Sequence, residues 1–131
     1  MTFDRPPADF FDRVGGEQFF VDLVAEFYRG VAEDTELRAL YPEYPDLAPA
    51  EERLRLFLMQ YWGGPGTYSQ QRGHPRLRMR HAPYVVNLDM RDRWLRHMRA
   101  ALDKLQPEPE LESWLWRYFE MAADSMRNVE G

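Results

Sequence analysis

The sequence predicts an all-α protein, and three observations support this fold class. Apolar residues recur at helical spacing in four long stretches, no segment alternates apolar and polar residues as a half-buried strand does, and prolines and glycines gather between the stretches. The chain has 131 residues, of which 44% are hydrophobic and 15% aromatic. This length and composition predict one ordered domain, 1–131, and exclude a disordered chain.

The first long helix is expected at about 16–33. Its apolar stripe consists of Phe20, Val24, Phe27 and Val31, with Phe19, Leu23 and Tyr28 beside it. A short turn is expected at 35–40. Pro42 and Pro45 bound the irregular stretch that follows.

The second helix is expected to start near Asp46, whose carboxylate can cap a helix, with Pro49 tolerated in the first turn. Its inner stripe consists of Leu54, Phe57, Leu58 and Tyr61. The glycines and proline of 63–65 end it.

The third and fourth helices follow a long connection. The third is expected at 88–105, where one apolar side carries Trp94, Leu95, Met98, Ala101, Leu102 and Leu105 and only Arg91 interrupts the stripe. The fourth begins after Pro107 and Pro109, and its stripe consists of Leu111, Leu115, Tyr118, Phe119, Ala122 and Met126.

The connection between the second and third helices, 63–87, is unusually long for a small domain. Pro75 can open a short helix and Pro83 lies beyond its end, so one or two helical turns are expected at 75–82. The rest of the connection is expected to be irregular. A loop of this length is usually functional or wraps around something.

Charge and composition limit the function further. The net charge is -5, yet eight arginines and only two acidic residues lie between positions 72 and 99. Two interpretations of this excess stay open: a solvated basic face, or a site where guanidinium groups hold carboxylates or phosphates. The acidic balance argues against a nucleic-acid binder. The absence of cysteine, of a signal peptide and of a long apolar run predicts a cytoplasmic protein without membrane attachment.

The three histidines, His74, His81 and His97, are the candidate metal ligands. His97 lies off the main apolar stripe of the third helix and is expected to be exposed, whereas His74 can orient the turn before Pro75. His81 follows Leu77 by four residues on one face of the short helix. From the residues alone, a lone histidine there is more often structural than a ligand.

Most classes of catalytic site lack support in the sequence. There is no cysteine, no serine lies in a nucleophile-elbow motif, and neither zinc-ligand spacing nor a phosphate-binding loop is present. A cofactor whose metal needs only one protein ligand is compatible with these residues, and haem is such a cofactor.

Three motifs make the chain resemble the group II truncated haemoglobins over about 11–129. They are AEERLRLFL at 50–58, QYWGGP at 60–65 and GHPRLRMRHAP at 73–83. The resemblance implies a two-over-two helical sandwich around haem b, with a long proximal loop and a short proximal helix. Residues 1–10 form an N-terminal extension beyond the family's usual start.

The resemblance also implies the residues of the site. His81 matches the proximal ligand of the haem iron, and Tyr28, Tyr41 and Trp94 match the donors on the distal, ligand-binding side. Without the resemblance, Tyr28 and Trp94 would be interpreted as core residues. The resemblance implies further haem contacts at Arg53, Leu54, Phe57, Tyr61, Leu77 and Arg80. Of these, Arg53, Tyr61 and Arg80 are expected to face the propionates.

We therefore expect a haem b protein that reversibly binds O2 and similar ligands such as CO and NO. The alternative is a haem enzyme with peroxidase-like or NO dioxygenase activity. A third possibility is a helical domain without haem, against which His81 argues. An unidentified reductase is an expected partner. The sequence leaves two alternatives open for the oligomeric state: a monomer, or a homodimer with an exposed Trp114 or Trp116 at the contact, although one of these tryptophans can equally pack into the core.

Overall fold

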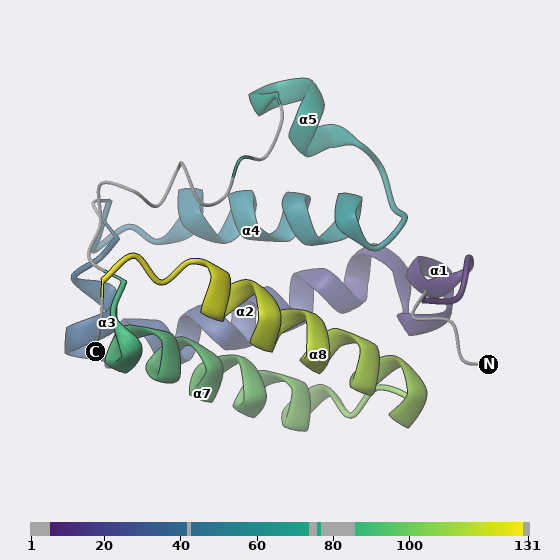
Figure 1. Ribbon diagram of the computed structural model, residues 1–131. Helices are drawn as coiled ribbons and strands as arrows, with labels where there is room; N and C mark the ends of the chain where they lie inside the picture. Colours follow the sequence, from purple (N-terminus) through teal and green to yellow (C-terminus); the bar gives the residue numbers. More distant parts are fainter. Residues whose placement is uncertain (1–5, 42, 74–75, 77–85, 130–131) are drawn as a thin grey trace.

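The computed structural model describes residues 6–41, 43–73, 76 and 86–129, and these residues form helices joined by turns and loops (Figure 1). No strand occurs within these ranges, so the all-α prediction is confirmed. None of the described helices is long and apolar enough to cross a membrane.

Four long helices lie where the apolar periodicity predicts them. α2 (Gly16–Glu33) and α7 (Leu88–Leu105) have the expected bounds, and α8 (Pro109–Ser125) begins at the second of the two prolines. α4 (Ala48–Tyr61) starts two residues after Asp46. Asp46 still stabilises this helix start, because its carboxylate accepts a hydrogen bond from the Ala48 amide at 3.1 Å.

Short helices complete the described part of the chain. α3 (Thr35–Arg38) is the expected turn, whereas α1 (Phe10–Val14) and α5 (Thr67–Arg72) were not expected. The connection 63–87 was expected to be irregular outside 75–82, and this expectation is wrong for its described part, because that part contains α5. The predicted helix at 75–82, apart from Arg76, lies outside the described residues.

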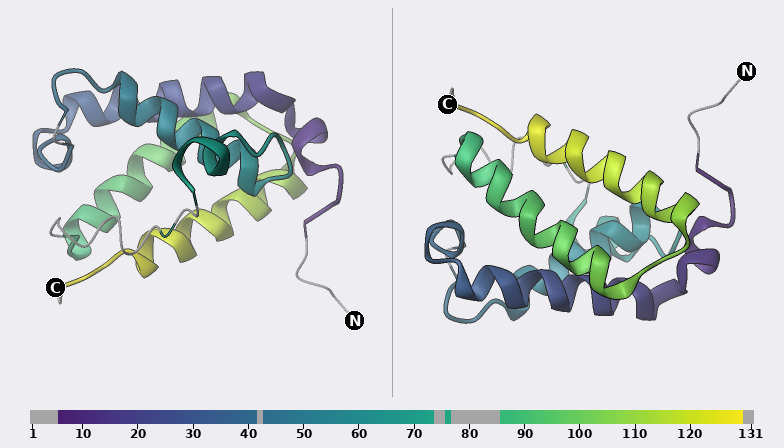
Figure 2. Two further views of the ribbon diagram at one scale, coloured as in Figure 1. Left: turned by 90° about the horizontal axis from the view of Figure 1, so that it is seen from above. Right: turned by 90° about the horizontal axis from the view of Figure 1, so that it is seen from below.

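The long helices form two antiparallel pairs. In the view of Figure 1, α4 runs above α2 and in the opposite direction, and α8 runs back along α7. α2 packs against both α4 and α7 and so joins the pairs. The views from above and below show that the two pairs cross each other (Figure 2).

The inner faces of all four long helices build the core. Its large, fully buried side chains include Phe20, Leu23, Val24, Phe27, Val31, Leu58, Met98, Leu102, Leu111, Leu115 and Phe119. Burying each such side chain contributes about 1.5–3 kcal/mol to folding. At one end, Phe10 of α1 stacks on Trp62, with ring centroids 4.3 Å apart.

His97 is not exposed, contrary to the expectation from its place off the apolar stripe. Its side chain retains 18% of its accessible surface, and its ring lies against Gly30 of α2. A Cβ atom at Gly30 would lie 2.6 Å from the His97 Nδ1 atom. The close approach of α2 and α7 at this point therefore requires glycine.

Candidate functional site

A cavity of about 590 Å³ is bordered by both helix pairs. Its walls come from α2, α3 and the segment that follows it, α4, α5, α7 with Val86 before it, and α8, and most of the lining side chains are apolar. This volume is in the range of small-molecule and cofactor sites. A small number of polar side chains also converge on the cavity, and they decide what chemistry it can support.

Three hydrogen-bond donors line the cavity together. Tyr28 comes from α2, Tyr41 from the segment after α3, and Trp94 from α7. The rings of Tyr28 and Tyr41 meet edge to face with centroids 5.5 Å apart. Phe27, one residue before Tyr28, packs 4.9 Å from the Trp94 ring. The structure thus brings these three sequence-predicted residues together.

Burial further stabilises the protonated form of both phenols. It raises the pKa of Tyr28, which is only 6% exposed, well above the ordinary value of 10.0, and the nearby Tyr41 adds to this effect. Burial also raises the pKa of Tyr41, while hydrogen bonding with Tyr28 and Trp94 acts in the opposite direction. At neutral pH each hydroxyl therefore carries a proton that it can donate.

Apolar side chains form the walls around these donors. α4 contributes Ala50, Leu54 and Phe57, and α8 contributes Phe119 and Ala123. The methyl group of Ala50 cannot donate a hydrogen bond. A ligand beside Ala50 must therefore find its donors on other residues of the cavity, such as Tyr28, Tyr41 and Trp94.

Three arginines and one glutamate also line the cavity: Arg53, Arg72, Arg91 and Glu43. Arg53 Nη2 donates to Glu43 Oε1 at 2.7 Å, and this hydrogen bond lowers the pKa of Glu43. Arg91 Nη1 donates to Asp124 Oδ1 at 2.7 Å. The guanidinium groups of the lining arginines can also bind anionic groups such as carboxylates.

The structure does not bring every predicted residue to the cavity. Arg53, Leu54 and Phe57 line it, but Tyr61 is not among the described lining residues. The ring of Tyr61 is 49% exposed and packs 4.2 Å from the ring of Tyr118, which does line the cavity. The remaining predicted contacts lie outside the described residues, and they are Leu77, Arg80 and His81.

Sequence reasoning missed many of the lining residues, among them the polar or aromatic side chains of Tyr68, Arg91 and Tyr118. Tyr68 lies in the six-residue α5, which is too short for a periodic pattern. Tyr118 looked like an ordinary member of the α8 stripe. Arg91 did carry a signal, because a charged side chain on the apolar stripe of α7 marks a position where that stripe leaves the core.

The bacterial-like globin family matches residues 9–128 of this chain. Because the match spans most of the sequence, the chain belongs to this family. The family binds ligands of the globin type, and it implies a haem cofactor and small gaseous ligands.

Individual relatives define the class more narrowly. Group 2 truncated hemoglobin YjbI of Bacillus subtilis is 36% identical over 113 residues, which are 86% of this chain and 84% of that protein. A thermostable hemoglobin of Thermobifida fusca is 62% identical, with a TM-score of 0.89 over 92% of this chain and 97% of that one. The group II truncated hemoglobin of Bacillus anthracis is 31% identical, with a TM-score of 0.89 over 97% and 96%.

These relatives place the chain among the group II truncated hemoglobins. The predicted two-over-two helical sandwich is confirmed, because the solved structures of this class superpose on nearly the whole chain. The two crossing helix pairs described above are the two layers of that sandwich.

The described residues fit a haem in three respects. The cavity has the volume of a cofactor site and walls of apolar side chains, which suit a porphyrin. The lining arginines suit its two carboxylates. The three donors suit a polar ligand on one face of it.

Proposed function

We propose that this protein holds haem b and reversibly binds O2 and other diatomic ligands such as CO and NO. The observation that carries this proposal is the set of three donors, Tyr28, Tyr41 and Trp94, on a cavity whose lining side chains are mostly apolar. Hydrogen bonds are stronger in such surroundings than in water, because the local dielectric constant is low. Diatomic ligands that carry partial negative charge when bound can therefore be held there and released again.

His81 is proposed as the proximal ligand of the haem iron. Its support is the motif at 73–83 together with the course of the chain around it. Arg72 lines the cavity before this motif, and Val86 lines it five residues after His81. In the sequence, His81 therefore stands between two residues that line the cavity.

When bound, haem supplies an iron atom that coordinates a diatomic ligand. The protein supplies hydrogen bonds and exclusion of water. The indole N–H of Trp94 and the hydroxyls of Tyr28 and Tyr41 can donate to a ligand that carries partial negative charge, such as O2. They offer much less to CO, which is less polar. This arrangement favours retention of O2.

The arginines of the cavity are proposed to hold the two haem propionates. Arg53 was predicted for this role, and Arg72 and Arg91 also line the cavity. A guanidinium group can bind a carboxylate through two parallel hydrogen bonds. The predicted propionate contacts of Arg80 and Tyr61 and the predicted haem contact of Leu77 stay predictions.

A visible absorption spectrum of the purified protein tests the proposed function. We expect a Soret band at a stoichiometry of one haem per chain, and a shift of this band when CO is added to the reduced protein. A protein that takes up no haem, even when haem is supplied, would contradict the proposal.

Several finer predictions are tested by separate experiments. Peroxidase-like or NO dioxygenase activity uses the same cavity, and turnover with a reductant measures it. A homodimer through Trp114 or Trp116 predicts an elution volume in gel filtration that depends on concentration.

Four further points stay predictions: the reductase partner, the cytoplasmic location, the single domain 1–131 and the extension 1–10.

A further inference from the structure

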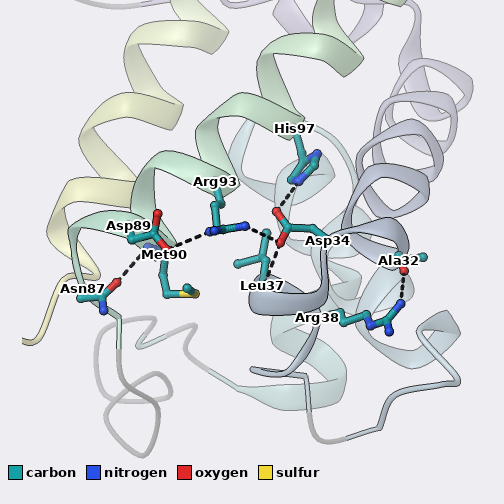
Figure 3. A network of polar contacts seen from close by, with 9 residues as sticks. All are labelled: Ala32, Asp34, Leu37, Arg38, Asn87, Asp89, Met90, Arg93 and His97. Atoms are coloured by element: carbon teal, nitrogen blue, oxygen red, sulfur yellow. Dashed lines mark hydrogen bonds and ion pairs between the residues drawn. The ribbon is translucent and has the colours of Figure 1, made fainter.

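A buried carboxylate lies outside the cavity, where α2, α3 and α7 meet. Asp34 is 8% exposed, and it is the one charged residue that is buried within the described ranges. Figure 3 shows its carboxylate between the side chains of Arg93 and His97. We call these three residues the Asp34 cluster.

Both carboxylate oxygens of Asp34 have specific partners. Oδ1 accepts from Arg93 Nη1 at 2.9 Å and from the Leu37 amide at 3.1 Å, and Oδ2 lies 2.8 Å from His97 Nε2. Burial alone would raise the pKa of Asp34, but the hydrogen bonds from His97, Leu37 and Arg93 lower it to about 2. The carboxylate is therefore ionised at neutral pH, and an ionised carboxylate only accepts.

Backbone hydrogen bonds connect the Asp34 cluster to Tyr41. Asp34 is the N-cap of α3, and its carbonyl accepts from the Arg38 amide at 2.9 Å. The Tyr41 amide in turn donates to the Arg38 carbonyl at 3.0 Å. A short series of backbone hydrogen bonds thus connects Asp34 to the tyrosine that lines the cavity.

The contacts of Arg93 and His97 with Asp34 connect the cluster to Trp94 on α7. Arg93 and His97 are four residues apart on α7, so their contacts to Asp34 fix both the position and the rotation of this part of the helix. Trp94 directly follows Arg93 and lines the cavity. The same carboxylate therefore holds the segment that carries one donor against the helix that carries another.

We infer that Asp34 is a positioning residue, which sets the distance between Tyr41 and Trp94 and thereby the discrimination between O2 and CO. This inference rests on the proposed function. A hydrogen bond depends steeply on distance and angle, so a small shift of α3 against α7 weakens the donors without removing them. The consequence is faster release of O2 and little change for CO.

The test compares two substitutions around the same arginine. Asp34→Asn keeps the shape of the side chain but removes its charge. Asp89→Asn is the matched control, because Asp89 is the exposed partner of Arg93, with Oδ2 2.8 Å from Arg93 Nε. We expect O2 dissociation from the haem-loaded Asp34→Asn protein to accelerate roughly three- to ten-fold, as for a weakened charge-assisted hydrogen bond. CO dissociation, and both rates in the control, should change less than about two-fold.

A second measurement uses the haem-free protein. Exchange of the Tyr41 amide hydrogen should be faster in Asp34→Asn than in the wild type or in Asp89→Asn, because α3 is held less firmly. His97→Gln removes one contact of the cluster and should act in the same direction. It replaces Asp34→Asn if that variant does not fold.

Two results would overturn the inference. One is a loss of stability in Asp34→Asn with an unchanged ratio of O2 to CO dissociation rates, which would make the carboxylate merely structural. The other is unchanged amide exchange at Tyr41. If the wild type takes up no haem, the proposed function fails, while the exchange measurement still decides whether Asp34 holds the segment that carries Tyr41.

Discussion

Trp94 is the donor that α7 contributes to the cavity, and its indole N–H can be removed while an aromatic ring is kept. Trp94→Phe keeps an aromatic ring on α7 and deletes the indole N–H. A hydrogen bond to a charged acceptor contributes about 1.5–3 kcal/mol, so O2 dissociation should accelerate roughly 10- to 150-fold. CO dissociation should change much less. Stopped-flow displacement of both gases measures the two rates.

The control for this substitution is Trp114→Phe. Trp114 lies on α8 with Arg117 over its ring and is not among the described residues that line the cavity. This variant should leave both rates unchanged. Equal acceleration of O2 and CO in Trp94→Phe would instead indicate a wider cavity, and Tyr28 or Tyr41 would then be the main donor.

The proximal histidine can be tested by removal and chemical rescue. His81→Gly deletes the proposed iron ligand, so the visible spectrum of the reduced protein should change and added imidazole should restore much of it. His74→Gly, seven residues earlier, should keep the wild-type spectrum. An unchanged spectrum in His81→Gly without imidazole would refute the assignment and make His74 the next candidate.

At the scale of helices, the approach of α2 to α7 depends on the absence of a side chain at Gly30. In Gly30→Ala the new methyl would meet the His97 ring, which cannot move away without losing its contact to Asp34. Such overpacking typically costs about 1–3 kcal/mol of unfolding free energy. Urea denaturation measures this loss.

Two further variants show whether the clash with His97 is the cause. In the His97→Ala background, Gly30→Ala should cost less unfolding free energy than it does in the wild type, because the ring that the new methyl group would crowd has been removed. Gly66→Ala is the control, since the nearest atom to its new Cβ, Gln60 Oε1, lies at 3.7 Å. Additive effects in the double variant would assign the cost to another contact.

The Asp34 cluster predicts how stability depends on pH. The pKa of Asp34 is about 2 in the folded protein, against an ordinary value of 3.8 when unfolded. The unfolded chain therefore binds a proton first as the pH falls. The stabilisation, about 2 kcal/mol at neutral pH, is complete above about pH 4 and is lost as the pH falls towards 2.

Urea denaturation between pH 2 and 7 checks this prediction. The difference in unfolding free energy between the wild type and Asp34→Asn should shrink below about pH 4. Asp103→Asn, which changes an exposed carboxylate at the other end of α7, should show a smaller dependence on pH. A difference that stays constant over the whole range would contradict the ionic role of Asp34.

The length of an element decided how well the sequence predicted it. α2 and α7 each have 18 residues, so their apolar stripes repeat several times and define both ends. α1 and α5 have five and six residues, and each buries only one side chain. A single buried residue has no period, so neither helix could be predicted. The start of α4 was uncertain because Asp46 can cap from outside the helix.

Contacts between distant parts of the chain explain the other differences. His97 was expected to be exposed, but its partner Asp34 lies 63 positions away and the space for its ring comes from a glycine on another helix. Tyr61 packs on Tyr118, which comes from another helix, and the haem contact that the resemblance implies for Tyr61 stays a prediction. Tyr28, Tyr41 and Trp94 could be named in advance only through the family resemblance, because each also fits an apolar stripe or the core.

For the molecule as a whole, two crossing helix pairs leave a cavity that neither pair could form alone. α2 and α4 provide one side, and α7 and α8 provide the other. The tyrosines and Trp94 come from opposite pairs, so the pairs must be packed together before these donors can act on one ligand. Ligand binding is therefore a property of the complete sandwich.

The proposed function is reversible O2 binding, and repeated oxygenation measures it. The haem-loaded protein is reduced without O2, freed of excess reductant, and exposed alternately to O2 and to nitrogen while its visible spectrum is recorded. We expect the Soret band to shift with O2 and to return under nitrogen through several cycles. A spectrum that does not respond to O2, or that changes once to the oxidised form and does not return, would contradict reversible O2 binding.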